Sequence, residues 1–241
     1  MNAAAPVSAR LHVTLGGDAG PVRSVLLHPA GGGITPYLQL GLHLSRRGPV
    51  AAIRADGLMP GELPQHDVKA MVEAYAPLLA APGRPDLLIG WSLGGVLAWE
   101  LAARLAADGP APAVVLIDSA TRADPAPGGR LSELKQQVLL SATSALGTVA
   151  ADEVVATVDA HVEAVARHRV TVRHDGPALL LACGEEEVTE RLGDWTGLGA
   201  QLRVERLPGG HFDVFSAQTL PVLLRHLDRF LDDTFEPGGR R

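Results

Sequence analysis

Residues 86–105, DLLIGWSLGGVLAWELAARL, join a short aliphatic run to a helical pattern through a turn that contains serine. The run Leu87–Ile89 is short and uninterrupted, which favours a strand buried on both faces of a parallel sheet. A helical pattern follows over Leu93–Ala107. Between them GWSLG, residues 90–94, fits G-x-S-x-G, which is a weak pattern alone but a strong one in a strand–turn–helix setting. The stretch predicts an α/β fold with a nucleophile, Ser92, at the end of a strand.

The glycines on either side of Ser92 have a steric reason. A serine on such a sharp turn holds a strained backbone, and side chains at positions 90 and 94 would collide there. The helix that follows points its positive end toward the charge that develops in a serine-mediated reaction. The alternative is that Ser92 only caps this helix, and the strand–turn–helix setting favours the nucleophile.

The alternation of strands and helices continues through most of the chain. Buried-strand patterns cover Val22–Leu27, Val50–Ile53, Leu87–Ile89, Ala113–Ile117 and Ala178–Ala182, and two more alternating patterns at Leu11–Leu15 and Gln201–Leu207 indicate strands nearer the edges. Helical patterns cover Pro36–Arg47, His66–Leu79, Leu93–Ala107 and Val222–Leu231. This order predicts a mostly parallel central sheet with helices on both faces.

Residues from about 121 to 175 interrupt this order, because they contain no good strand pattern. Two helical patterns lie there, Leu131–Leu146 and Asp152–His168, and the second places four valines on roughly one face. We interpret the segment as a helical lid inserted over the strand ends. Ordinary crossover helices are the alternative, but two helices exceed what one crossover requires.

Composition limits the class of protein. A chain of 241 residues with 46% hydrophobic residues suits one domain covering 1–241 with a large core. The net charge is −6 with no basic stripe, so nucleic acid is not an expected partner. The one cysteine, Cys183, indicates a reducing compartment. Because we find no signal peptide and no apolar run that could span a membrane, we expect a soluble cytoplasmic protein with no membrane partner.

Acyl transfer by a serine also needs backbone N–H donors for the oxyanion. The first expected donor is Leu93, the residue after the nucleophile. The second is expected in HPAGGG, residues 28–33, where Ala30 or Gly31 is favoured because Pro29 has no N–H. The alternative function of this glycine run is a flexible turn.

The general base is predicted to be His211 in LPGGHFDVF, residues 207–215. It follows a strand pattern and precedes the last helix, which suits the chain order serine, acid, histidine. His28 is disfavoured as the base because it precedes Ser92. His161 and His168 share one face of a predicted helix and are interpreted as surface or packing residues. No cluster of carboxylates or cysteines indicates a metal site.

Asp118 is the favoured acid, because it ends the apolar run AVVLID one strand after the serine. A carboxylate there would hold His211 in the required tautomer. The alternative is Glu185–Glu187, which follow a later strand but are more typical of a solvated loop. Asp213 is interpreted as a turn residue.

Five motifs together resemble the type I thioesterase domains of nonribosomal peptide and polyketide synthases, members of the α/β-hydrolase superfamily. They are LLHPAGGG with PYLQL at 26–40, GLMPGE at 57–62, GWSLGGVLAWELAARL at 90–105, VVLIDS at 114–119 and RLPGGHF at 206–212. The resemblance covers nearly the whole chain outside the lid. It implies an α/β-hydrolase fold, and it implies Asp118 as the acid, whereas freestanding type II enzymes tend to place the acid after the later strand. The chain is expected to be either freestanding or an excised synthase domain.

The resemblance also implies the reaction and its partners. The substrate would be an acyl, peptidyl or polyketide chain on the phosphopantetheine arm of a carrier protein, with no cofactor or metal of the enzyme's own. Ser92 would take the acyl group and pass it to water or to a nucleophile within the chain. Leu139, Leu140, Val155 and Val162 are candidates to line the acyl channel under the lid. A small-molecule carboxylesterase with the same triad and a noncatalytic interaction protein remain as alternatives.

Overall fold

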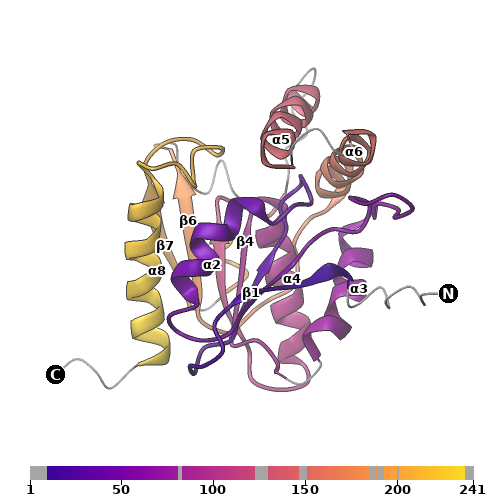
Figure 1. Ribbon diagram of the computed structural model, residues 1–241. Coiled ribbons are helices and arrows are strands. Elements are labelled where there is room, and N and C mark those ends of the chain that lie inside the picture. Colours follow the sequence, from indigo (N-terminus) through magenta and orange to yellow (C-terminus); the bar gives the residue numbers. More distant parts are fainter. Residues whose placement is uncertain are drawn as a thin grey trace.

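A computed structural model describes residues 10–80, 83–122, 130–146, 151–184, 188, 193–199 and 201–236, and within these residues one sheet of seven strands forms the centre of the molecule (Figure 1). The spatial order of the strands is β1-β3-β2-β4-β5-β6-β7. Only β1 runs antiparallel to its neighbour, and the other pairs are parallel, as predicted. The strands are β1 (His12–Gly16), β2 (Ser24–Leu27), β3 (Val50–Ile53), β4 (Leu87–Trp91), β5 (Ala113–Ile117), β6 (Ala178–Cys183) and β7 (Leu202–Leu207).

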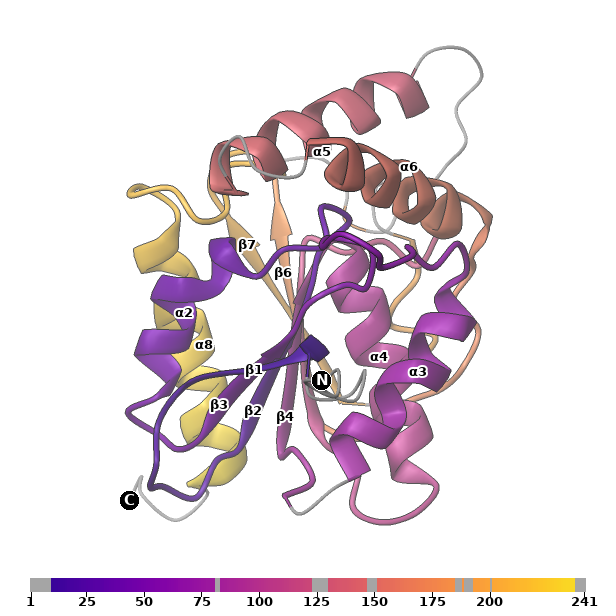
Figure 2. The same cartoon turned by 45° about the vertical axis from the view of Figure 1, so that its right-hand side comes forward.

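Helices cover both faces of this sheet, which confirms the predicted fold class (Figure 2). One face carries α2 (Leu38–Leu44), which continues the 3₁₀ helix η1 (Thr35–Tyr37), together with α8 (Leu220–Phe235). The other face carries α3 (Val68–Ala80) and α4 (Leu93–Ala106). The helical pattern expected over Pro36–Arg47 is split into the 3₁₀ turn η1, which contains Pro36, and α2, which ends at Leu44. A proline is tolerated in such an opening turn because its missing N–H would have no partner there.

The core consists of two layers, because alternate residues of each central strand point to opposite faces. Leu88, Leu116 and Leu180 pack into the layer that contains α4, and each is at most 1% exposed. The residues that follow them, such as Ile89 and Ile117, pack into the layer that contains α8. With both faces sealed by aliphatic side chains, the strand ends are the part of the sheet open to polar chemistry.

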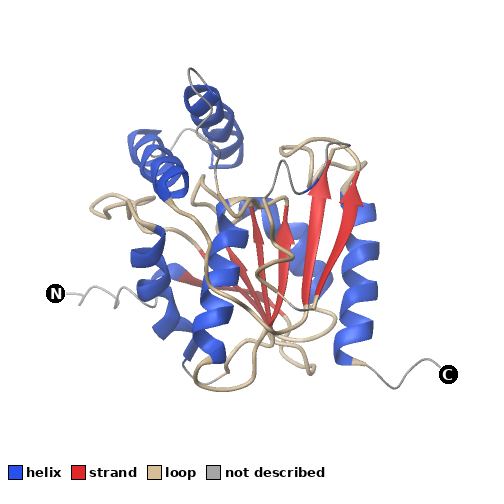
Figure 3. Cartoon of the chain, turned by 180° about the vertical axis from the view of Figure 1, so that it is seen from behind, coloured by secondary structure: helices blue, strands red, loops and turns tan. Residues whose placement is uncertain are grey.

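Two helices, α5 (Arg130–Leu146) and α6 (Ala151–Arg167), lie over the carboxyl ends of the strands (Figures 1 and 3). Their bounds are within one residue of the two predicted lid helices. Helix α6 is part of the core, because Val154, Val158 and Val162 are buried in the layer that contains α4. Helix α5 is joined to α6 by Lys135, whose Nζ lies 3.0 Å from Asp159 and 3.1 Å from Glu163. The two helices therefore differ in how tightly they are held to the body.

Tyr37 joins the ends of two neighbouring strands. It is completely buried, its hydroxyl donates to the Leu27 carbonyl oxygen at 2.7 Å, and it accepts from the Trp91 N–H at 2.9 Å. The pairing of β2 with β4 ends at Leu27 and Gly90, so the hydroxyl extends the hydrogen bonding beyond the last paired residues. Burial raises the pKa of Tyr37, which keeps the hydroxyl neutral and able to donate.

We predict that Tyr37→Phe lowers the free energy of unfolding by about 1–3 kcal/mol, because it leaves a buried N–H and a buried carbonyl without a partner. Urea denaturation followed by circular dichroism measures the change. Ser45→Ala removes an exposed hydrogen bond to the Leu42 carbonyl in the adjoining helix and should change stability by less than about 0.5 kcal/mol. Equal stability of Tyr37→Phe and the wild type would show that the bridge is not needed.

Candidate active site

Ser92 occupies the sharp turn between β4 and α4 in a conformation that is rare for a residue with a side chain, with φ 58° and ψ −122°. Its N–H donates to the Ile117 carbonyl oxygen of β5 at 3.0 Å, which fastens the turn to the neighbouring strand. Although Ser92 is the residue that precedes α4, its side chain makes no capping hydrogen bond. The hydroxyl therefore does not serve the helix, and Ser92 lines a pocket instead.

Three glycines make this turn possible. A Cβ on Gly90 would lie 1.9 Å from the carbonyl carbon of Gly94, and a Cβ on Gly94 would lie 2.3 Å from the Leu27 carbonyl oxygen. These collisions are the ones expected from the sequence motif. Gly95 was not singled out from the sequence, but a Cβ there would lie 2.0 Å from the Ser119 hydroxyl oxygen. The start of α4 can approach β2, β4 and β5 only because all three positions lack a side chain.

Asp118, directly after β5, and His211, in the loop between β7 and α8, form a hydrogen-bonded pair. His211 Nδ1 donates to Asp118 Oδ2 at 2.7 Å, and the Cys183 N–H donates to Asp118 Oδ1 at 2.7 Å. The Asp118 side chain is completely buried, whereas that of His211 is 24% exposed. Because a buried carboxylate accepts the Nδ1 proton, the other ring nitrogen, Nε2, is left as the proton acceptor in the neutral ring.

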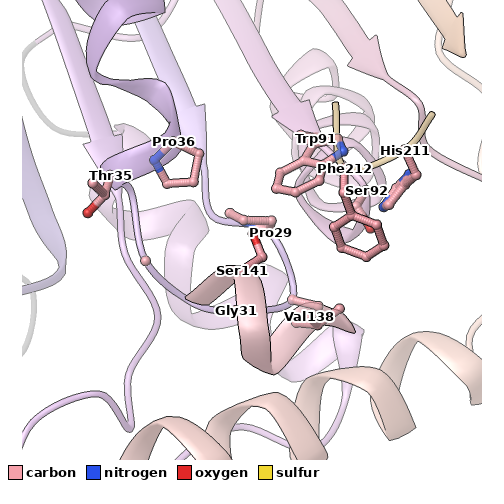
Figure 4. Close-up of a pocket in the computed structure, with 12 residues that line it drawn as sticks. Pro29, Gly31, Thr35, Pro36, Trp91, Ser92, Val138, Ser141, His211 and Phe212 are labelled. Atoms are coloured by element: carbon pink, nitrogen blue, oxygen red, sulfur yellow. The ribbon is translucent and has the colours of Figure 1, made fainter. Parts of the chain in front are cut away.

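One pocket contains Ser92 and His211 (Figure 4). The Trp91 ring lies 5.2 Å from the His211 ring, and the Phe212 ring meets the His211 ring edge-on at 4.9 Å, so aromatic contacts limit how His211 turns. Most of the lining is apolar or backbone, and it comes from four parts of the chain: Pro29, Ala30, Gly31, Gly33, Thr35, Pro36, Trp91, Ser92, Val138, Ser141, His211 and Phe212. Such a pocket suits an apolar chain with few polar groups.

The loop after β2 forms another part of the pocket wall. The Gly32 N–H donates to the Pro29 carbonyl oxygen at 2.8 Å, closing a tight turn around Ala30 and Gly31, which both line the pocket. Gly32 has a φ of +76°, and a Cβ there would lie 2.9 Å from that of Ala55. The structure thus brings the predicted N–H donors of this loop to the same pocket as Ser92. The Leu93 N–H opens α4, where the first turn of a helix leaves its donors without helical partners.

Two histidines that the sequence analysis set aside lie under this loop. His28 Nδ1 donates to the Pro29 carbonyl oxygen at 2.9 Å, and His28 Nε2 lies 2.8 Å from the Tyr75 hydroxyl. His161 is only 1% exposed, and its Nδ1 donates to the Ala30 carbonyl oxygen at 3.0 Å. The two rings are stacked, with centroids 5.0 Å apart. The interpretation of His161 as a surface or packing residue missed this bond, although its place beside the valine face of α6 was a usable signal.

Burial controls the charge of both imidazoles. It lowers the pKa of His28 to about 4 and that of His161 to about 3, and for His161 the neighbouring His28 lowers it further. Both rings are therefore neutral near pH 7. His168, in contrast, lies at the end of α6, where its Nε2 is 2.8 Å from a carboxylate oxygen of Glu100 on α4.

The four residues predicted to line an acyl channel lie outside this pocket. Val162 is completely buried in the core, Leu139 packs against that core, and Leu140 and Val155 are 62% and 40% exposed. None of these four is among the described residues that line the pocket. Val138 and Ser141 of α5 line it instead, because residues three apart lie on one face of a helix whereas 139 and 140 point elsewhere.

The remaining predictions concern acids, metals and membranes. Glu185–Glu187 lie outside the described residues. Asp213 accepts a hydrogen bond from the Gly210 N–H at 3.0 Å, which confirms it as a turn residue. In the part of the chain that the structure describes, no group of three His, Cys, Asp or Glu residues is placed to hold a metal ion. Among the same residues, no helix combines the length and the apolar character that crossing a membrane requires.

Comparisons with known proteins agree on one family. The family model described as thioesterase domain matches residues 25–231. The nonribosomal peptide synthetase atqA of Aspergillus terreus is 36% identical over 35% of this chain, and thioesterase frbE of Dothideomycetidae sp. is 37% identical over 34% of it. The matches span 9% of atqA and 32% of frbE. The crystal structure of the NocB thioesterase domain in a covalent complex with a fluorophosphonate nocardicin G analog has the same fold, with a TM-score of 0.73, 24% identity, and 88% of this chain and 96% of that chain covered.

We predict that the free energy of unfolding falls as the pH drops from 6.5 to 4. In this range the unfolded chain protonates His28 and His161, whose ordinary pKa is about 6.5, while the folded protein keeps both neutral until the pH nears 4, where His28 also begins to protonate. Protons then favour unfolding, by up to about 1.4 kcal/mol per pH unit for each histidine. Urea denaturation at half-unit pH steps measures the slope. His161→Asn removes one of the two groups and should reduce the slope by that amount; an unchanged slope would mean that His161 is not held neutral.

Proposed function

The chain belongs to the thioesterase domain family, and from this membership we propose that it releases an acyl chain from a phosphopantetheine thioester through an acyl intermediate on Ser92. The observation that carries the proposal is that His211, which is bonded to the buried Asp118, lines the same pocket as Ser92, whose backbone is strained and whose hydroxyl makes no capping bond. A nucleophile, a base with its Nε2 available and an acid that orients the base are the parts that such a reaction needs.

In the first step His211 Nε2 removes the proton from the Ser92 hydroxyl while Ser92 Oγ attacks the thioester carbonyl carbon. Asp118 stabilises the resulting imidazolium without taking the proton itself. When the tetrahedral intermediate collapses, the carbon–sulfur bond breaks and His211 gives the proton to the departing thiol. The products of this step are an ester on Ser92 and the free thiol of the carrier arm.

The negative oxygen of that intermediate needs donors fixed in advance. The Leu93 N–H lies next to the nucleophile at the positive end of α4, and the loop around Ala30 and Gly31 lies across the pocket. Donors of this kind act mainly on the transition state, where the charge is localised on oxygen. We assign the oxyanion hole to Leu93 together with Ala30 or Gly31.

In the second step water, or a hydroxyl or amine of the bound chain, attacks the ester carbonyl with His211 as the base, and Ser92 is released. Val138 and Ser141 of α5 contribute to the wall of the pocket, so they would contact the acyl chain at this stage. The likeness to a part of a nonribosomal peptide synthetase supports a carrier protein as the partner that delivers this chain. No cofactor of the enzyme's own enters either step.

We predict that Asp118→Asn lowers kcat by roughly 10⁴-fold, because an amide at this position favours the wrong His211 tautomer. Turnover of an acyl N-acetylcysteamine thioester, with circular dichroism to verify folding, measures the effect. Glu187→Gln should leave kcat within about twofold, since it represents the alternative acid. Loss of activity in the glutamine variant with normal activity in the asparagine variant would assign the acid to Glu187.

The substrate class is tested by comparing kcat/KM for matched acyl thioesters and oxygen esters, with intact-protein mass spectrometry after short incubations. We expect faster turnover of the thioester and an added acyl mass that is absent from Ser92→Ala, because Ser92 Oγ forms the intermediate. A fluorophosphonate should label the wild type and not Ser92→Ala. Higher kcat/KM for the oxygen ester would favour a carboxylesterase, and no labelling at all would favour a noncatalytic protein.

A further inference from the structure

Two consecutive carbonyl groups of the loop after β2 are bound by two stacked imidazoles. His28 Nδ1 binds the Pro29 oxygen at 2.9 Å, and His161 Nδ1 binds the Ala30 oxygen at 3.0 Å. The rings stack with an interplanar angle of 21°. His28 comes from the end of β2 and His161 from the middle of α6, so the pair joins the sheet to the helix above it.

The hydrogen bonds determine which nitrogen carries the proton. A carbonyl oxygen only accepts, so Nδ1 must be the protonated nitrogen in both rings. His28 Nε2 is then an acceptor for the Tyr75 hydroxyl at 2.8 Å, while His161 Nε2 is buried without a hydrogen-bond partner among the described residues. Each neutral ring therefore donates one hydrogen bond to one carbonyl, and burial beneath the loop keeps both rings in place.

These carbonyls belong to the peptide groups that carry the candidate donors. In a trans peptide the C=O and the next N–H lie in one plane and point in opposite directions. The bond from His28 to the Pro29 oxygen therefore orients the Ala30 N–H, and the bond from His161 to the Ala30 oxygen orients the Gly31 N–H. Whichever of the two N–H groups receives the oxyanion, a buried histidine controls the plane in which it points.

Helix α6 is also attached to the segment that follows β3. Thr157 lies one turn before His161 on the same face of α6, and its hydroxyl donates to the Gly57 carbonyl oxygen at 2.9 Å. Thr157 Cγ2 would lie 3.0 Å from a Cβ on Gly32, so the helix touches the loop itself. Thr157 and His161 are 0% and 1% exposed, which makes this contact a closed interface.

We call the loop after β2, residues 28–33, the oxyanion loop. We infer that His161, stacked on His28, is a positioning residue that holds this loop in its donating orientation, and that α6 thereby takes part in catalysis without touching the substrate. The inference rests on the proposed thioesterase function. It divides the inserted segment into two parts with different tasks. Helix α6 supports the oxyanion loop from behind, and α5 contributes Val138 and Ser141 to the pocket wall.

The test compares His161→Asn with His161→Leu. The two replacement side chains have the same branching, and the asparagine amide nitrogen sits on Cγ as the histidine Nδ1 does, whereas leucine has no donor. We expect His161→Asn to keep kcat within about threefold of the wild type. We expect His161→Leu to lower kcat about tenfold to a hundredfold with little change in KM, since loss of a whole oxyanion donor costs 10²–10³.

If His161 only packs against its neighbours, the ranking of the two variants by stability should be opposite to the ranking by kcat given above. A leucine at position 161 suits the apolar surroundings of Val158 and Val162. The urea concentration at the unfolding midpoint should therefore be at least as high for His161→Leu as for His161→Asn. A leucine variant that is stable yet slow, beside an asparagine variant that is active, supports the positioning function. Wild-type kcat in His161→Leu, or equal loss in both variants, would overturn it.

A matched control and a substitute variant complete the design. His168→Leu makes the same exchange at the end of α6, where the partner is Glu100, and should leave kcat within about twofold. If His161→Leu does not fold, His161→Gln replaces it, because the glutamine amide corresponds to Nε2 and not to Nδ1. Glutamine as active as asparagine would then contradict the inference.

A second readout separates this inference from the proposed function. The rate at which a fluorophosphonate labels Ser92 depends on the oxyanion hole but not on the natural acyl group. If the wild type labels but hydrolyses no thioester, the proposed substrate class is wrong while the labelling rates still test His161. We expect labelling of His161→Leu to slow in parallel with kcat; labelling at the wild-type rate would count against the inference.

Discussion

The backbone of Ser92, with a φ of 58°, costs on the order of 1–3 kcal/mol and persists only because its surroundings leave it no alternative. Gly90 and Gly94 let the end of β4 and the start of α4 approach within distances that any Cβ would prevent. The Ile117 carbonyl takes the Ser92 N–H, and the Tyr37 hydroxyl takes the Trp91 N–H one residue earlier. Neighbouring strands and η1 thus hold one turn, and that turn places Ser92 at the carboxyl end of β4, with a side chain that makes no capping hydrogen bond.

A second strained position lies on the adjacent strand end. Asp118 has a φ of 46° and a completely buried carboxylate, which is stable only with donors on its oxygens. The Cys183 N–H from β6 and His211 Nδ1 supply two of them. Because β4, β5 and β6 are adjacent and parallel, their carboxyl ends meet at one edge, and the serine turn, the acid and its backbone donor come together there. The parallel order of the strands therefore positions these groups relative to one another.

The inserted helices are two elements with different attachments, although they form one hairpin-like pair in the sequence. The valine face of α6 is continuous with the core and brings His161 to the Ala30 carbonyl of the loop after β2. Helix α5 is tied to α6 by Lys135, packs on the same core through Val138, and contributes Val138 and Ser141 to the pocket. An acyl chain bound at Ser92 would therefore meet a wall on α5, while the loop opposite keeps its shape through α6. If the proposed function holds, substitutions on α5 should change the choice of acyl chain, and substitutions on α6 should change how the transition state is stabilised.

The sequence alone was sufficient to predict the strands, most helices and the sharp turn at Ser92. These features follow from local patterns: aliphatic runs of strand length, helical spacing of valines, and glycines two residues either side of Ser92. The placement of Asp118 and His211 also followed, since both end on the carboxyl side of predicted strands. Only the tertiary structure decided which faces of α5 and α6 line the pocket: among the described residues Val138 and Ser141 do, and the four predicted residues, Leu139, Leu140, Val155 and Val162, do not. It alone revealed His161 bound to the Ala30 carbonyl, since those residues lie 131 positions apart and no local pattern links them. Contacts of that kind depend on the rotation of a helix about its axis and on its position against the sheet. Both are determined by tertiary packing and not by the local sequence pattern.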